Sequence, residues 1–98
     1  VRIEAGGHVL GMRGRCVMVD DTTRCLAPAG MALIRTLASR PGRVVSREEL
    51  LAALPGGGGD THAVETAVAR LRSALGAPSI VQTVVKRGYR LAVDPEGP

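Results

Sequence analysis

The sequence predicts an α+β domain in which an N-terminal antiparallel sheet is followed by three helices and a C-terminal β-hairpin. Short β-prone runs separated by turn residues occupy residues 1–27, which is typical of a small antiparallel sheet. Apolar residues recur at helical spacing in three segments between 28 and 75. Two further β-prone runs occupy 80–93, and the turn sequence Lys86-Arg87-Gly88 between them predicts a hairpin. Together these segments form one predicted domain, 1–98.

Size and composition agree with one such domain. A chain of 98 residues can bury a modest core, which must be aliphatic because Phe and Trp are absent and Tyr89 is the one aromatic residue. The formal charge of +4 favours a polyanionic partner. A chain so poor in aromatic residues is not suited to stacking on unpaired bases, as single-strand binders do.

Neither a membrane segment nor a secretion signal is expected. No apolar run approaches the roughly 20 residues of a membrane span, and no signal peptide is evident. We therefore expect a cytoplasmic protein with no membrane contact. The chain begins at Val1 without a methionine, so we expect it to be a fragment of a longer protein.

The predicted sheet has strands at 8–12, 15–19 and 24–26. Cys16 and Cys25 fall on two arms of one predicted hairpin, where their side chains can face each other. A disulfide is one outcome. Two thiols are the alternative, and we favour it because the cytosol keeps cysteines reduced. The two cysteines show neither CxxC nor metal-ligand spacing.

Residues that favour the beginning or the end of a helix define the first two helices. Pro28 suits the first turn of a helix, where its missing N–H is harmless, and Arg40-Pro41-Gly42 ends that helix. Ser46 and Glu49 predict a capping box, in which each side chain accepts a hydrogen bond from the backbone N–H of the other. The buried face of this second helix consists of Leu50, Leu51 and Leu54, and Pro55 ends it.

The third helix, 61–75, begins with Asp60 or Thr61 as its cap. Its apolar stripe comprises Val64, Ala67, Val68, Leu71 and Leu75. At about 100° per residue, the opposite face is small and polar, with Arg70 at its edge. Such a face suits the major groove, where Arg70 can bind guanine bidentately, although a solvated surface face is the alternative. The residues of that face are His62, Thr66, Ala69 and Ser73.

The predicted hairpin is basic at its tip. Lys86, Arg87 and Arg90 place three cations on a thin protrusion, and Gly88 accommodates a left-handed backbone. Cations are favoured in the minor groove by its negative potential, although an ordinary exposed turn would also carry charge. The basic hairpin and the polar helix face together indicate binding to duplex DNA.

Three segments resemble the OmpR/PhoB-type winged-helix effector domain of bacterial response regulators. They are RPGRVVSREELL (40–51), AVETAVARLRSAL (63–75) and VQTVVKRGYRL (81–91), within a match from about Leu26 to Val93. The resemblance implies a winged helix-turn-helix fold and a DNA-binding transcription regulator. No residues of the chain have metal-ligand spacing, and no cofactor is expected. The recognition helix 61–75 would enter the major groove, and the wing 83–90 would lie on the minor groove or the backbone.

The resemblance also implies roles for individual residues. The positions of Glu65, Thr66 and Arg70 imply contacts to bases. Contacts to the DNA backbone are expected at His62, Arg72, Ser73 and Thr83, and wing contacts at Lys86, Arg87 and Arg90. The loop Pro55, Gly56, Gly57, Gly58 and Gly59 corresponds to a segment that touches RNA polymerase in several relatives.

The chain departs from the family pattern at several of these places. Pro55 stands where relatives usually have Trp, and Ala67 and Ala69 where they often have His and Arg. In the wing, Val85 replaces the usual Arg, and Lys86-Arg87 replace a Gly and a small or apolar residue. The positively charged residues of the wing therefore stand at other positions than in relatives. The base preference of relatives cannot be assigned to this chain. A glycine loop also offers polymerase few side chains.

A protein-interaction module is the alternative function. Its basic face would dock on an acidic partner or on a neighbouring domain, including an N-terminal domain of the same chain. The segments LPGGGG and TVVKRGYRL also resemble the version of this domain that follows, in the same chain, a module similar to uroporphyrinogen-III synthase. A phosphorylated receiver would instead make the protein part of a two-component system. Catalysis is not expected, because His8 and His62 have no nucleophile and carboxylate arranged around them.

Overall fold

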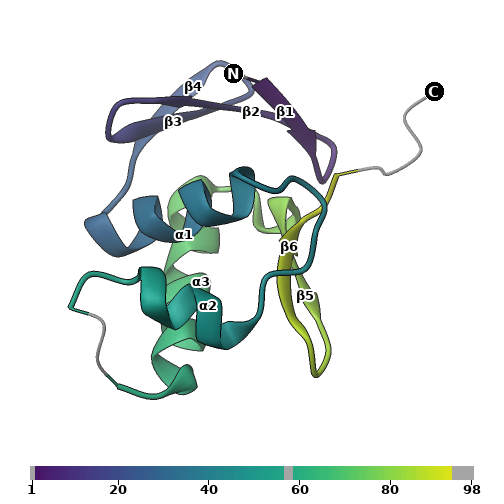
Figure 1. The fold of residues 1–98 in the computed structure, drawn as a ribbon. Coiled ribbons are helices and arrows are strands. Elements are labelled where there is room, and N and C mark those ends of the chain that lie inside the picture. The colour runs from purple at the N-terminus through teal and green to yellow at the C-terminus, as the bar shows by residue number, and fades with distance from the viewer. Residues whose placement is uncertain (1, 57–58, 94–98) are drawn as a thin grey trace.

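A four-stranded antiparallel sheet covers one side of three helices, and a two-stranded hairpin lies beside them (Figure 1). The computed structural model describes residues 2–56 and 59–93. This order of elements confirms the predicted fold class. The elements are β1 (Arg2–Ala5), β2 (His8–Arg13), β3 (Cys16–Val19), β4 (Thr22–Cys25), α1 (Pro28–Ala38), α2 (Arg47–Ala53), α3 (Thr61–Leu75), the 3-10 turn η1 (Pro78–Ile80), β5 (Val81–Val84) and β6 (Gly88–Leu91).

Two-residue turns build the sheet as a meander. Asp20 and Asp21 both have positive φ, 50° and 71°, as a type I′ turn requires, and so do Gly6 and Gly7, at 58° and 84°. Gly14 has φ 62° at the first position of the turn between β2 and β3. These turns match the twist of the strands that they join. The sequence analysis missed β1, which pairs with β2 through the Gly6-Gly7 turn.

Asp20 ties its turn back to β2. Its carboxylate accepts a hydrogen bond from the Val9 N–H at 2.8 Å and contacts the His8 ring. The Val9 hydrogen bond, together with the His8 contact, holds the pKa of Asp20 below its ordinary value. The contribution to stability is therefore present at neutral pH and is lost as pH falls through the lowered pKa of the folded state.

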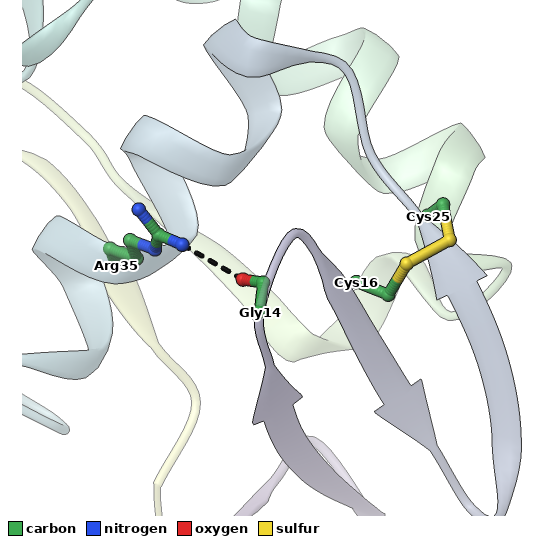
Figure 2. The surroundings of a disulfide bond; sticks show 4 residues. All are labelled: Gly14, Cys16, Cys25 and Arg35. Carbon is green, nitrogen blue, oxygen red and sulfur yellow. Dashed lines mark hydrogen bonds between the residues drawn. A yellow bond between two sulfur atoms is a disulfide. The ribbon is translucent and has the colours of Figure 1, made fainter.

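Cys16 and Cys25 form a disulfide between β3 and β4 (Figure 2), so our expectation of two thiols is wrong for this structure. The reason is the register of the sheet. Cys16 is directly opposite Cys25, with their Cα atoms 4.0 Å apart. The adjacent β2–β3 turn is held to α1 by Arg35, whose Nη2 donates to the Gly14 carbonyl at 2.8 Å.

We expect reduction of this disulfide to lower the free energy of unfolding by about 2–3 kcal/mol, because it closes a loop of only about ten residues. The two cysteines are separated by 9 positions in sequence. Chemical denaturation with and without dithiothreitol measures the effect. A Cys16→Ser/Cys25→Ser variant should be insensitive to the reductant. Equal stability of the parent chain in both conditions would contradict the prediction.

The helices begin and end where the sequence predicts. Pro28 begins α1, and the left-handed Gly76 (φ 67°) ends α3. Asp60 caps α3, with Oδ1 accepting from the His62 N–H at 3.0 Å. In α2 only half of the predicted capping box forms. Ser46 Oγ accepts from the Glu49 N–H at 3.1 Å, but the Glu49 carboxylate pairs with Arg40 Nη1 at 3.4 Å instead of with the Ser46 N–H.

Aliphatic side chains from the sheet, the helices and the hairpin form one core. No polar or charged residue is buried among those that the structure describes. Of the three leucines predicted to face inward from α2, Leu50 is fully buried, whereas Leu51 and Leu54 pack against the core from its edge. The largest fully buried side chains are Leu10, Val17, Leu33, Ile34, Leu37, Val45, Leu50, Val64, Leu71, Leu75, Ile80 and Leu91.

The sheet and the C-terminal segment are bonded to each other. The Gly6 N–H donates to the Ala92 carbonyl at 2.8 Å, and Ser79 Oγ donates to the Gly6 carbonyl at 2.8 Å. A Cβ on Gly6 would lie 2.3 Å from the Ser79 carbonyl oxygen, so only glycine permits this approach. The first turn of the chain and the end of β6 therefore meet on one side of the molecule.

The hairpin differs in detail from the prediction. Its strands are shorter than the predicted runs 80–85 and 89–93, because Ile80 belongs to η1 and the Arg87 N–H closes a turn onto the Val84 carbonyl at 2.9 Å. Lys86, with φ 66°, takes the left-handed position in that turn. Gly88 lies in β6 with φ 143°, so it also has positive φ, but its role is a close approach to Val45.

Candidate nucleic-acid interface

The exposed face of α3 is small and polar, as predicted. The helix buries Val64, Val68, Leu71 and Leu75 on the opposite side. Arg70 extends from the edge of the exposed face, and neither a hydrogen bond nor an ion pair links it to another residue in the described ranges 2–56 and 59–93. The exposed residues of this face are His62, Thr66, Ala69, Arg70 and Ser73.

Glu65 lies on the flank of α3 that faces α2. Its carboxylate is 3.6 Å from Arg47 Nε and 3.5 Å from His62 Nδ1. The structure thus brings Glu65 together with an arginine of α2 that the sequence analysis did not single out. The carboxylate is therefore already paired with the Arg47 guanidinium and lies beside the His62 ring within the domain itself.

Arg72 and Thr83 are both expected to contact the DNA backbone, and in the structure they are hydrogen-bonded to each other. Arg72 Nη2 donates to Thr83 Oγ1 at 2.8 Å and to the Val81 carbonyl at 2.8 Å. Its Nε donates to the same carbonyl at 3.1 Å. The guanidinium therefore fastens α3 to β5, and its Nη1 group keeps two further N–H donors.

Tyr89 connects these pairs. The residue is 4% exposed, and the guanidinium carbons of Arg47 and Arg72 lie 5.5 and 5.8 Å from the centre of its ring. Both distances suit cation–π attraction. We call Arg47, Glu65, Arg72, Thr83 and Tyr89 the Tyr89 cluster; it joins α2, α3 and the hairpin. The sequence offered one signal for it, since Tyr89 is the one aromatic residue of the chain.

The wing tip carries Lys86 and Arg87, which are both exposed, beside Val85, which is 75% exposed. Arg90, also predicted as a wing cation, is not at the tip. Its Nε donates to Gln82 Oε1 at 2.6 Å and its Nη1 to the Gly42 carbonyl at 3.2 Å, so it braces the hairpin.

A hollow beside the tip adds a cation that the sequence analysis missed. Arg43 lines it with Lys86 and Arg87, and within 2–56 and 59–93 the one carboxylate in its lining is that of Glu49. Arg43 precedes α2, so the chain before α2 and the wing tip contribute positive charge to the same hollow.

Replacing Arg72 with alanine is expected to loosen the wing and to lower the free energy of unfolding by about 1–3 kcal/mol, because the Val81 carbonyl and the Thr83 hydroxyl lose a charged donor. Chemical denaturation gives the stability, and amide hydrogen exchange of 81–91 locates the loosening. The control is Arg70→Ala, an exposed change expected to stay within about 0.5 kcal/mol of the parent. Equal stability of the two variants would refute the role of Arg72.

The loop between α2 and α3 is described only in part. Pro55, Gly56 and Gly59 are exposed, whereas Gly57 and Gly58 lie outside the described residues. Within 2–56 and 59–93, no group of three or more His, Cys, Asp or Glu side chains is placed to hold a metal ion. In the same part of the chain, no helix has the length and apolar character needed to cross a membrane.

Comparison with known sequences finds one family model, described as transcriptional regulatory protein, C terminal, which matches residues 21–91. The chain is 43% identical over 68 residues to transcriptional regulatory protein CseB of Streptomyces coelicolor, covering 67% of this chain and 29% of that protein. CseB of Streptomyces avermitilis is also 43% identical over 68 residues, covering 67% of this chain and 28% of that protein. The chain thus spans less than a third of the length of these relatives.

Solved structures show the same fold. The DNA-binding domain of Klebsiella pneumoniae RstA, in complex with the RstA box, has a TM-score of 0.72 at 29% identity and covers 93% of this chain and 96% of that one. The DNA-binding domain of CpxR from E. coli has a TM-score of 0.71 at 27% identity, with coverage of 93% and 95%. The DNA-binding domain of AdeR, in complex with an intercistronic region, has a TM-score of 0.78 at 21% identity, covering 87% and 95%, a likeness of fold alone.

Proposed function

The chain belongs to the family of transcriptional regulatory protein C-terminal domains, and from this membership we propose how it engages duplex DNA. It is a winged-helix DNA-binding domain of a transcriptional regulator. In our proposal α3 enters the major groove, and the β5–β6 wing lies on the minor groove or the backbone. The RstA domain, the same fold at 29% identity, was solved in complex with its RstA box.

One observation carries this proposal: the polar face of α3 and the basic wing tip belong to elements that the Tyr89 cluster fastens together. The start of α3 and the tip of the hairpin lie on the side away from the four-stranded sheet (Figure 1). The α3 helix in the major groove and the wing cations beside neighbouring phosphates can then act as a single rigid unit. Contacts to phosphates would supply most of the affinity.

We propose different roles for the residues of α3. Those facing the bases are Glu65, Thr66 and Arg70. Among them Arg70 has the strongest case, because it carries five donors in a planar fork and is not engaged by another described residue. Glu65 would act with its partner Arg47. The residues facing the DNA backbone are His62, Arg72, Ser73 and Thr83.

Arg72 can both fasten the wing and bind a phosphate. Its Nε and Nη2 groups donate to Val81 and Thr83, and the two N–H groups of Nη1 have no hydrogen-bond partner among the described residues. The wing cations Lys86 and Arg87 would add contacts to phosphates or to the minor groove, and Arg90 would brace the hairpin whose turn carries them.

A salt series tests the proposal. We expect a Lys86→Ala/Arg87→Ala variant to bind every duplex about tenfold more weakly, and the slope of log affinity against log salt to fall in magnitude by about 2. Fluorescence anisotropy with a random duplex and with a duplex selected by the parent chain measures both. The matched control is Arg13→Ala/Arg15→Ala, which removes the same charge from the exposed β2–β3 turn. Equal losses in the two variants would overturn the proposed interface.

Partners other than DNA are further proposals. The chain spans 29% of the length of the Streptomyces coelicolor relative, so we propose a preceding domain in the same protein. We propose either a receiver or an enzyme-like module for that domain. RNA polymerase would meet the loop after Pro55, where the glycines offer it mainly backbone groups. We place the domain in the cytoplasm, where glutathione and thioredoxin would act on the Cys16–Cys25 pair.

A further inference from the structure

An apolar cavity of about 400 Å³ lies between the first turn of α1, the end of α2 and one flank of α3. It is separate from the hollow at the wing tip. Its volume is within the range of small-molecule binding sites, roughly 300–1,000 Å³. The walls are formed by leucine side chains and alanine methyl groups, among them Leu26, Leu54, Ala67 and Leu71.

Short side chains keep this space open. Alanine or glycine occupies positions in α1 and α3 where longer side chains would fill the gap, including Ala29, Gly30 and Ala67. The backbone conformation of Gly30 does not require glycine, because its φ is not in the left-handed region. The nearest atoms to a Cβ there would be Leu26 Cβ at 3.5 Å and Leu71 Cδ1 at 3.6 Å, which is ordinary contact. Glycine is less favourable than alanine within a helix, so Gly30 keeps the cavity wide at some expense of stability.

Among the residues that the structure describes, Arg70 is the one charged residue in the lining of the cavity, and no carboxylate lines it. Arg72 and Arg90 are bonded within the domain, whereas no residue that the structure describes hydrogen-bonds or ion-pairs with Arg70. An unpaired guanidinium beside an apolar wall complements a carboxylate that carries an apolar body. The hollow at the wing tip differs, since Glu49 already offsets its cations.

The start of α1 favours an anion at the same place. Its cap residue Ala27 has no side chain that can accept a hydrogen bond, and Pro28 has no N–H. The first N–H groups of a helix have no partner within it, so those of Ala29 and Gly30 are available where both residues line the cavity.

We propose that this cavity binds a small amphiphilic carboxylate, with the apolar body among the leucines and the carboxylate on Arg70. Arg70 is also the residue to which we assign base recognition, so such a ligand would compete with DNA. This second step rests on the proposed function, whereas the binding site itself does not.

Titration of the ¹⁵N-labelled domain with octanoate tests the site. We expect amide shifts at Ala29, Gly30 and Ala67 and a dissociation constant of about 1 mM, as the usual affinity per heavy atom gives for about ten heavy atoms. Octylammonium, with the same chain and the opposite charge, should bind at least about tenfold more weakly. Arg70→Gln should weaken octanoate about tenfold and leave octylammonium unchanged.

Two further variants fill the cavity without touching the exposed face of α3. Ala29→Leu should weaken octanoate by about tenfold or more and leave DNA affinity unchanged, and Gly30→Ala should weaken octanoate less while raising the melting temperature. Equal binding of octanoate and octylammonium would overturn the site, as would unchanged octanoate binding in both filled variants.

The competition has its own readout. Octanoate at about ten times its dissociation constant should weaken binding of the selected duplex by about tenfold, as a simple competitor does. If octanoate binds at the cavity and DNA affinity does not change, the competition is wrong and the site stands. If the domain fails to bind DNA at all, the octanoate titration still decides whether the site exists.

Discussion

Replacing Arg70 with alanine is expected to weaken binding to the selected duplex by about 10- to 100-fold, which corresponds to the roughly 1–3 kcal/mol of a bidentate contact to guanine. Binding to random duplex should weaken far less, because phosphate contacts elsewhere remain. The structure makes Arg70 a clean target. It is exposed, and its removal breaks no hydrogen bond or ion pair among the residues that the structure describes.

The measurement is a selection of bound sequences from a random pool, made with the parent chain and with each variant. Arg70→Ala should lose the preference for guanine at one position of the site. Arg70→Lys is the informative companion, because it keeps the charge and loses the planar fork. We expect it to retain affinity for random duplex and to lose the preference. An unchanged selected sequence in both variants would exclude Arg70 from base recognition.

Gly88→Ala is expected to be the most destabilising small change in the hairpin, with a loss of about 3 kcal/mol or more in the free energy of unfolding. A Cβ there would lie 2.1 Å from the Val45 carbonyl oxygen, and the backbone has φ 143°. Val45 and Tyr89 exchange hydrogen bonds of 2.8 and 3.0 Å at this point. The added methyl group must push β6 away from the segment before α2 and break that bridge.

Gly14→Ala separates the two causes of this loss. Gly14 also has positive φ, 62°, but a Cβ there would have nothing within 4 Å. It should therefore cost only the roughly 1–2 kcal/mol of the backbone conformation. Chemical denaturation of both variants gives the comparison. A Gly88→Ala domain that is no less stable than Gly14→Ala would show that the approach to Val45 is unimportant.

The elements that the sequence predicted well are those marked by local chemistry. Pro28, Ser46 and Gly76 act within one turn of the helix that each begins or ends, so their effect is visible in a few consecutive residues. The periodicity of α3 was equally local, and its buried residues follow it. The β1 strand was missed because the Gly6-Gly7 turn had not been recognised as the start of a hairpin.

What the sequence did not predict depends on residues far apart in the chain. The Tyr89 cluster joins side chains from α2, α3 and the hairpin, and no spacing in the sequence indicates that they meet. The capping role of Glu49 failed for the same reason, since Arg40 competes for its carboxylate. Cys16 and Cys25 show the converse, because a hairpin in which they could face each other was predicted, and the argument from the reducing cytosol then favoured thiols.

The hydrogen bonds between the β1–β2 turn and the end of β6 determine where other protein segments can be joined to this domain. Because Gly6 is held to Ala92, the polypeptide enters and leaves on the side of the sheet, away from the wing tip (Figure 1). A segment joined before Gly6 or after Ala92 would therefore start on the side away from the surface that we propose to meet DNA. We expect the domain to accept different neighbouring domains at its ends while that surface stays accessible.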